Sequence, residues 1–271
     1  MVVGTGLAIG RGAFAAGPAI AALIGAICLQ IGANLANDLF DFERGADTHE
    51  RLGPPRAAQM GLLKARELRL GTAVVFGLAM VAGLYLVYEA GWPIVVVGLA
   101  SIAGALVYTG GPWPAGYHAL GDLMTFVYFG VLAVAGTYYV QAGELPGAAL
   151  LASLPMGCTV TAILVINNLR DIPTDRETGK KTLGVVIGDR ATRWWYTLLM
   201  VAPFVLAIAA WPLGVGGPWV LVSLAATPMA FKLVRGVLDG MNGRALNPFL
   251  KATARFDLLF GLLFGLGLAL S

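Results

Sequence analysis

Residues 15–41 read AAGPAIAALIGAICLQIGANLANDLFD, an apolar run that ends in polar residues. Its first 23 residues contain no Asp, Glu, Lys or Arg, and a helix needs about 20 mainly apolar residues to cross a bilayer. The whole chain of 271 residues is 58% hydrophobic and 12% charged, with a mean hydropathy of +0.79. Soluble domains carry about 25% charged residues, so this chain lacks the polar surface of a water-exposed globule. The sequence therefore predicts a polytopic all-α membrane protein.

Long apolar runs predict eight full spans, at 15–36, 70–90, 92–109, 119–141, 146–168, 194–213, 216–234 and 248–270. The apolar stretch at 1–10 is about half a span, and we interpret it as part of a first helix that begins upstream. A signal peptide is the weaker alternative, since no positive charge precedes the stretch and apolar sequence resumes at once. We expect about nine transmembrane helices in a single domain, residues 1–271.

The basic residues predict the orientation of these helices. Of the 18 Lys and Arg residues, 17 lie in three regions, 44–69, 170–193 and 232–255, which include the connections after 15–36 and 146–168 and the one between the last two spans. An even number of spans separates these regions, so all open on one side, and only Arg11 lies on the other. By the positive-inside rule that side is cytoplasmic. The basic residues stand at helix ends beside acids, which does not suit nucleic acid.

The end of the opening stretch carries the first chemically informative pattern. Positions three and four apart share a helix face, so Asn34, Asn37, Asp38 and Asp41 form one polar stripe. We expect the helix to continue through this stripe toward the cytoplasmic surface. Gly45 is expected to end the helix, which lets Asp47 fold back toward the stripe.

A second polar segment follows the apolar run at 146–168. It contains Asn167, Asp171 and Asp175, so the pattern Asn-x-x-x-Asp occurs both at 37–41 and at 167–171. Four predicted spans separate the two copies, which places both on the same side of the membrane. Parallel internal repeats around a shared site recur in membrane proteins.

Two carboxylate clusters facing one cavity repel each other unless a cation and an anionic ligand lie between them. Mg²⁺ takes oxygen ligands and commonly binds through a few carboxylates and substrate phosphates. Basic side chains nearby are candidates to hold the remaining phosphate oxygens, namely Arg44, Arg56, Lys64, Lys180 and Lys181. The alternative is that the acids only pair with neighbouring Lys and Arg at the water interface. Two clusters that share one pattern on one side of the membrane favour a functional site.

The two segments resemble those of the UbiA superfamily of intramembrane prenyltransferases, in which Asn-Asp-x-x-Asp and Asp-x-x-x-Asp motifs bind Mg²⁺-diphosphate. The stretch 108–122, YTGGPWPAGYHALGD, is similar to the branch that prenylates 1,4-dihydroxy-2-naphthoate. The resemblance covers nearly the whole chain, except that members of this branch usually begin with a basic segment before the first span. It implies nine helices around a central cavity and metal ligands at Asp41, Asp47, Asp171 and Asp175.

The same resemblance implies a reaction. A polyprenyl group would pass from prenyl diphosphate to 1,4-dihydroxy-2-naphthoate with loss of its carboxylate as CO₂, giving demethylmenaquinol. Mg²⁺ and the acids Asp41, Asp171 and Asp175 would serve departure of the diphosphate, leaving an allylic cation that the electron-rich ring attacks. Tyr108 and Tyr117 are candidates to contact the ring.

Some assignments have alternatives. His118 is a candidate proton acceptor, but a loop histidine beside Pro and Gly is more often a surface hydrogen-bonding group. Asp122 is interpreted as a charge at a helix N-terminus. A sister prenyltransferase acting on 4-hydroxybenzoate, homogentisate or a chlorin would share both aspartate segments. An ion-coupled secondary transporter would explain the spans and the repeat, but transporter sites usually lie near the midplane on broken helices.

Overall fold

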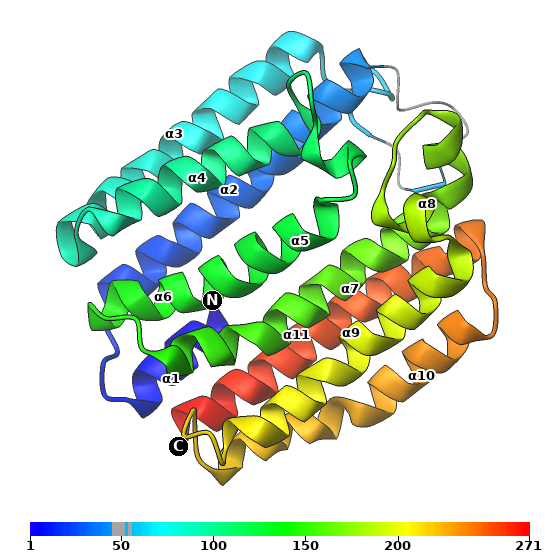
Figure 1. Cartoon of the computed structure of the whole chain (residues 1–271). Coiled ribbons are helices and arrows are strands. Elements are labelled where there is room, and N and C mark those ends of the chain that lie inside the picture. The colour runs from blue at the N-terminus through cyan, green and yellow to red at the C-terminus, as the bar shows by residue number, and fades with distance from the viewer. Residues whose placement is uncertain (45–51, 54–55) are drawn as a thin grey trace.

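The computed structural model describes residues 1–44, 52–53 and 56–271, and in this part the chain is a bundle of helices (Figure 1). The helices that form the bundle are α1 (Val2–Gly10), α2 (Ala16–Glu43), α3 (Ala65–Ala90), α4 (Pro93–Thr109), α5 (Gly121–Thr125), η2 (Phe126–Leu132), α6 (Ala133–Ala142), α7 (Gly147–Glu177), α9 (Asp189–Ala210), η3 (Pro218–Ala226), α10 (Thr227–Leu238) and α11 (Asn247–Ala269). Three short helices lie in connections: η1 (Ala115–Tyr117), α8 (Leu183–Ile187) and η4 (Gly243–Leu246).

The predicted spans are confirmed in the described part of the chain. Seven helices are long and apolar enough to cross a membrane, and α4 is a shorter apolar helix. Helices α5, η2 and α6 follow one another without interruption and together form the span Gly121–Ala142. Helix α1 has nine residues, about half a span, as the short apolar stretch at 1–10 predicted.

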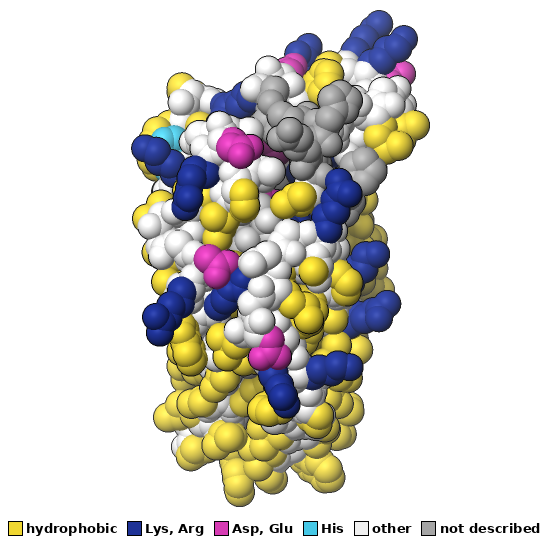
Figure 2. Space-filling view, turned by 90° about the vertical axis from the view of Figure 1, so that its right-hand side faces the viewer, with side chains coloured by type: hydrophobic (Ala, Val, Ile, Leu, Met, Phe, Trp, Pro, Cys, Tyr) yellow, Lys and Arg dark blue, Asp and Glu magenta, His cyan; other side chains and the backbone are white. Residues whose placement is uncertain are grey.

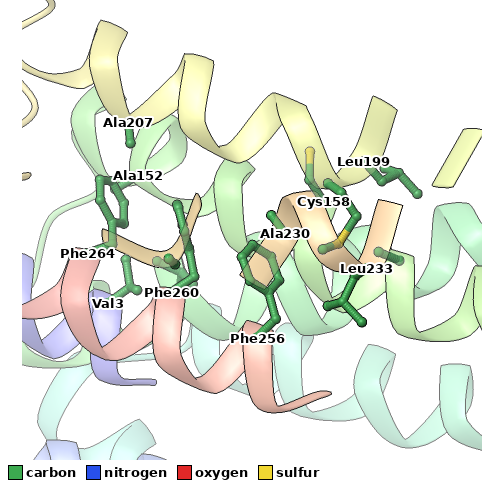
Figure 3. Close-up of a cluster of buried hydrophobic side chains, with 14 of the residues drawn as sticks. Val3, Ala152, Cys158, Leu199, Ala207, Ala230, Leu233, Phe256, Phe260 and Phe264 are labelled. Atoms are coloured by element: carbon green, nitrogen blue, oxygen red, sulfur yellow. The ribbon is translucent and has the colours of Figure 1, made fainter. Parts of the chain in front are cut away.

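The core lies between α7, α9, α10 and α11. Phe256, Phe260 and Phe264 stand four residues apart on one face of α11 and are fully buried against these neighbours (Figure 3). Their rings form a ladder with centroids 6.0 Å and 5.8 Å apart. Close packing also joins α1 to α11, because a Cβ atom at Gly6 would overlap the Gly265 carbonyl. Small residues allow this approach in lipid, where helices associate by close contact.

Polar residues gather at one end of the bundle. Figure 2 shows Lys, Arg, Asp and Glu side chains over the upper part of one face, while the lower part is almost entirely apolar. The C-terminal ends of α2, α4 and α7 lie at the same end as the N-terminal ends of α3, α9 and α11 (Figure 1). This arrangement agrees with the one-sided distribution of basic residues and brings the two aspartate segments to one end.

Helix α7 is longer than the predicted span, which ended at residue 168. It continues through Asp171, Pro173 and Asp175 to Glu177. The apolar run ends before the helix does. The last turns of the helix are held by buried Ile172 and by the polar contacts of Arg170. The second aspartate segment is therefore the C-terminal end of a helix and not a loop.

Candidate active site

Asp41 lies near the C-terminal end of α2, as the helical stripe predicted, and is buried. Its Oδ1 accepts a hydrogen bond of 2.8 Å from the Tyr117 hydroxyl, and its Oδ2 lies 3.8 Å from Arg56 Nη2. Tyr117 belongs to η1, in the connection after α4. The first aspartate segment thus faces the third segment that the sequence singled out, at 108–122.

Two cations lie over the ring of Tyr117. The Arg44 guanidinium carbon is 5.4 Å from the ring centroid and Lys180 Nζ is 5.0 Å from it. The Arg44 guanidinium also donates to the Gly111 carbonyl, and the Lys181 amide donates to the Tyr117 carbonyl at 3.1 Å. Residues from α2, the 110–118 connection and the segment after α7 therefore meet around one tyrosine.

Asp175 brings the second aspartate segment into this group. Its Oδ2 accepts a hydrogen bond of 3.3 Å from Thr182, and its carboxylate interacts electrostatically with Lys180, Asp171 and Asp41. Because Asp41 and Asp175 come from α2 and α7, the two aspartate segments do converge in space. Neighbouring like charges repel, so the arrangement favours a cation or the nearby basic groups between them.

Asp171 is held by its own neighbour. Arg170 Nε donates to Asp171 Oδ1 at 2.7 Å and Arg170 Nη2 donates to Oδ2 at 2.6 Å. The same guanidinium donates to Asn167 Oδ1 on α7 and to Asn247 Oδ1 at the start of α11, and Asn247 Nδ2 donates to the Leu52 carbonyl. Arg170 is only 2% exposed. Its contacts join α7 to the start of α11 and, through Asn247, to Leu52.

The sequence interpretation did not select Arg170 as a site residue. The available signal was a basic residue placed directly before Asp171 and three residues after Asn167, which lets it share a helix face with that asparagine. A buried arginine is retained only with its donors satisfied, since an unpaired buried charge is costly. Here four hydrogen bonds satisfy it, and Asn167 accepts one of them.

The remaining polar positions of the first segment have local partners. Asn37 Oδ1 accepts from the Thr109 hydroxyl at 2.7 Å, which joins α2 to α4. Asp38 Oδ2 accepts from the backbone amides of Ala57 and Ala58, at 3.0 and 3.4 Å, so Asp38 anchors the chain that precedes α3. Within the described residues, Asp38 Oδ1 is buried without a hydrogen-bond partner.

Other predicted site residues lie at the edge of this group. Asn34 is exposed and donates to the Gln30 carbonyl within α2. Lys64, exposed at the start of α3, contacts Glu67 through its backbone amide, and Lys181 is exposed. The prediction for Asp47, and that for Gly45, fall outside the described residues. His118 is exposed, stacks on Trp113 and donates through Nδ1 to the Pro114 carbonyl.

Tyr108 lies deeper, at the end of α4. Its hydroxyl interacts electrostatically with Asp122, Asp41, Asp175 and Arg56, which places it beside both aspartate segments. Asp122, in the first turn of α5, is buried and accepts a hydrogen bond of 2.8 Å from Trp195 Nε1 on α9. No pattern in the sequence pairs Asp122 with Trp195, because 73 residues separate them.

The donors present suit Mg²⁺ held together with a diphosphate. In the described residues no three His, Cys, Asp or Glu side chains are close enough to form a complete metal cage. Mg²⁺ usually keeps several waters and binds through one or two carboxylates and substrate phosphates, so a cage is not required. Asp41 and Asp175 supply carboxylates from two helices, and Arg56 and Lys180 lie beside them for phosphate oxygens.

These features define a polytopic membrane protein with a carboxylate site at one end of its helices. The UbiA prenyltransferase family model matches residues 1–263, and the chain belongs to this family. The family resemblance predicted from the two aspartate segments is therefore confirmed.

Individual relatives match along most of the chain. The 1,4-dihydroxy-2-naphthoate octaprenyltransferase of Escherichia coli is 38% identical over 277 residues, covering 100% of this chain and 90% of that protein. The enzyme of the same name from Mycobacterium tuberculosis is 39% identical and covers 97% of this chain and 88% of that protein. The chain is thus similar to naphthoate octaprenyltransferases over nearly their full length.

Solved structures support the fold. A digeranylgeranylglyceryl phosphate synthase structure matches with a TM-score of 0.63 at 17% identity, covering 99% of this chain and 94% of that chain. A UbiA homolog from Archaeoglobus fulgidus, bound to GPP and Mg²⁺, matches with a TM-score of 0.59 at 14% identity, covering 97% and 95%. At these identities the likeness concerns the arrangement of helices.

Proposed function

We propose that this protein is a Mg²⁺-dependent aromatic prenyltransferase that transfers a polyprenyl group from prenyl diphosphate to 1,4-dihydroxy-2-naphthoate. The carboxylate of the acceptor leaves as CO₂ and the product is demethylmenaquinol. The observation that carries the proposal is the convergence of Asp41 on α2 with Asp175 on α7, beside Arg56 and Lys180. The names of the relatives from E. coli and M. tuberculosis support the choice of acceptor.

The aspartates have the role of holding the metal and the diphosphate. In this proposal Asp41 and Asp175 bind Mg²⁺ together with Asp171 and Asp47. Bound Mg²⁺ supplies Lewis-acid stabilisation of the charge that develops on the departing diphosphate. Arg170 keeps the Asp171 carboxylate in one orientation through its two-pronged hydrogen bond.

The basic side chains have the role of contacting phosphate oxygens. Arg56, Lys180 and Arg44 lie around Asp41 and Tyr117, where they can replace water around the diphosphate. Such preorganised cations stabilise charge more effectively than water does, because they need little reorganisation during the reaction. The lipid-embedded helices below them exclude water, which would otherwise capture an allylic cation.

We also propose that the site faces the cytoplasm of the cell in which the protein spans the inner membrane. The support is the one-sided distribution of Lys and Arg, which the bundle gathers at its polar end (Figure 2). A cytoplasmic site gives water-soluble naphthoate access from one side while the prenyl chain lies among apolar helices.

Product analysis of the purified protein tests the function. With Mg²⁺ and a prenyl diphosphate, we expect turnover of 1,4-dihydroxy-2-naphthoate and none of 4-hydroxybenzoate. Naphthoate labelled in its carboxyl group should release labelled CO₂ in amounts equal to the prenylated product. Prenylation of 4-hydroxybenzoate alone, or a product that retains the label, would overturn the choice of acceptor.

A further inference from the structure

Asp122 is a buried carboxylate that diphosphate binding does not use. It is 6% exposed and stands in the first turn of α5, with partners on α7 and α9. Its Oδ2 accepts from Trp195 Nε1 at 2.8 Å, and Asn168 Nδ2 approaches its Oδ1 at 3.5 Å. Within the described part of the chain, no Lys or Arg forms an ion pair with it.

A purely structural role does not require a carboxyl group at this position. A neutral amide or hydroxyl would accept the same hydrogen bond from Trp195, and burying a charge without a cation is much more costly than burying a neutral group. A carboxylate has about four acceptor positions, and Asp122 uses one well and one weakly. Asp122 therefore keeps capacity to accept a further hydrogen bond.

The Tyr108 hydroxyl lies at the start of α5, next to the residue that precedes Asp122. The charges of Asp122, Asp41 and Asp175 all act on it. Glycines make room for this side chain: a Cβ atom at Gly121 would lie 3.1 Å from the hydroxyl oxygen, and one at Gly116 would lie 3.2 Å from the ring. The packing brings the hydroxyl directly against the start of α5.

We propose that Asp122 and Tyr108 form the subsite for a hydroxyl group of the aromatic acceptor. The acceptor hydroxyl donates a hydrogen bond to the Asp122 carboxylate and accepts one from the Tyr108 hydroxyl. This inference rests on the proposed function and adds to it the residues that recognise the ring. The location of this subsite fits the reaction, because the acceptor ring must lie next to the diphosphate that Asp41 and Asp175 are proposed to bind through Mg²⁺.

The test compares hydroxyl recognition in wild type and in Asp122→Asn, which keeps the shape and the acceptor for Trp195. Isothermal titration of the purified full chain measures binding of 1,4-dihydroxy-2-naphthoate and of its two analogues that each lack one hydroxyl. In wild type, at least one analogue should bind about tenfold more weakly than the dihydroxy acid, since hydrogen bonds to charged groups are stronger than those between neutral groups. In Asp122→Asn that difference should fall below twofold.

Steady-state kinetics and a matched variant separate this role from a general effect on folding. Asp122→Asn should raise KM for the naphthoate about tenfold and leave KM for prenyl diphosphate within twofold of wild type. Asp257→Asn is the control, because Asp257 is another carboxylate in a membrane helix, with a hydrogen bond of 2.5 Å from Thr159. It should leave both KM values and the preference among naphthoates unchanged.

Each result has a distinct meaning. If Asp122→Asn keeps the full preference for the dihydroxy acid, or raises KM equally for the naphthoate and for prenyl diphosphate, the acceptor subsite is overturned. Turnover by the wild type would still support the proposed function in that case. Equal effects of Asp122→Asn and Asp257→Asn on acceptor binding also overturn it. If wild type neither binds nor prenylates the naphthoate, the proposed function fails and this inference fails with it.

Discussion

The Tyr117 hydroxyl donates a hydrogen bond of 2.8 Å to Asp41 Oδ1, although 76 residues separate the two in the chain. The bond joins the connection after α4 to the first aspartate segment at the polar end of the bundle. Arg44 and Lys180 lie over the same tyrosine ring, so Tyr117 contacts groups from both aspartate segments. One tyrosine thus orients a carboxylate and supports two of the cations proposed to face the diphosphate.

Replacing Tyr117 with Phe should weaken handling of the diphosphate. The change removes the hydrogen bond to Asp41 and keeps the ring under Arg44 and Lys180. A hydrogen bond to a charged group contributes about 1.5–3 kcal/mol, so we expect a loss of about tenfold or more in kcat/KM for prenyl diphosphate. Steady-state kinetics at saturating naphthoate measure this loss.

Tyr88→Phe is the matched control for this change. Tyr88 is 86% exposed near the end of α3, far along the helix from its start at Ala65, and its replacement should leave kcat/KM unchanged. A Tyr117→Phe enzyme with the kinetics of wild type would show that Asp41 needs no orientation by Tyr117.

Replacing Arg170 with Met should destabilise the fold strongly. Arg170 is buried and its guanidinium contacts Asp171, Asn167 and Asn247. Breaking a buried ion pair by removing one partner typically costs about 3–5 kcal/mol, because the other charge remains buried. Thermal unfolding in detergent should show a large fall in Tm.

Arg176→Met is the control for Arg170, since Arg176 lies on the same helix and is exposed. Substitutions at such surface positions usually change stability by less than about 0.5 kcal/mol. Equal Tm values for the two variants would contradict the role of Arg170 as the connection between α7, α11 and residues 52–53.

Cysteine labelling tests the orientation. In a variant without Cys28 and Cys158, cysteines placed at Thr48 or Thr178 should react with a membrane-impermeant reagent from the cytoplasmic side only. A cysteine at Gly143 should react only from outside, because Gly143 ends α6 at the opposite end of the bundle from Thr178. Labelling of Thr48 and Thr178 from opposite faces would remove the shared site.

The parts that could be predicted from sequence are those set by local patterns. Hydropathy located the spans because bilayer thickness fixes the length of an apolar run. Helix periodicity placed Asp38 and Asp41 near each other at the end of α2, and the described part of α2 ends at Glu43 with Arg44 as its cap. The repeat of Asn-x-x-x-Asp at 37–41 and 167–171 predicted that the two segments face one cavity, and Asp175 of the second segment interacts electrostatically with Asp171 and Asp41.

The parts that could not be predicted depend on contacts between distant residues. Asp38 shares the polar stripe with Asp41, but its carboxylate accepts hydrogen bonds from the amides of Ala57 and Ala58. No local sequence pattern predicts this contact, because the amides belong to a segment about 20 residues further along the chain. Asp122 was interpreted as a charge at a helix N-terminus. Its hydrogen-bond partner, Trp195 on α9, could not be predicted from that local position.

The extent of α7 was underestimated for a related reason. Hydropathy falls after Asn168, and Pro173 ordinarily opposes a helix, because it removes a backbone donor. Arg170 and Ile172 nevertheless bury their side chains against other elements and keep the last turns helical. Tertiary contacts thus override the local signal, as they do at many helix ends.

The central claim is that Asp41 and Asp175 act on one Mg²⁺-diphosphate, and binding measures it most directly. Isothermal titration of a prenyl diphosphate into the purified protein, with and without Mg²⁺, compares wild type, Asp41→Asn, Asp175→Asn and the double variant. We expect Mg²⁺ to strengthen binding in wild type only, and the double variant to bind no more weakly than either single variant, because residues that act as a unit are not additive. Full Mg²⁺-dependent binding in either single variant, or losses that add in the double variant, would contradict a single shared site.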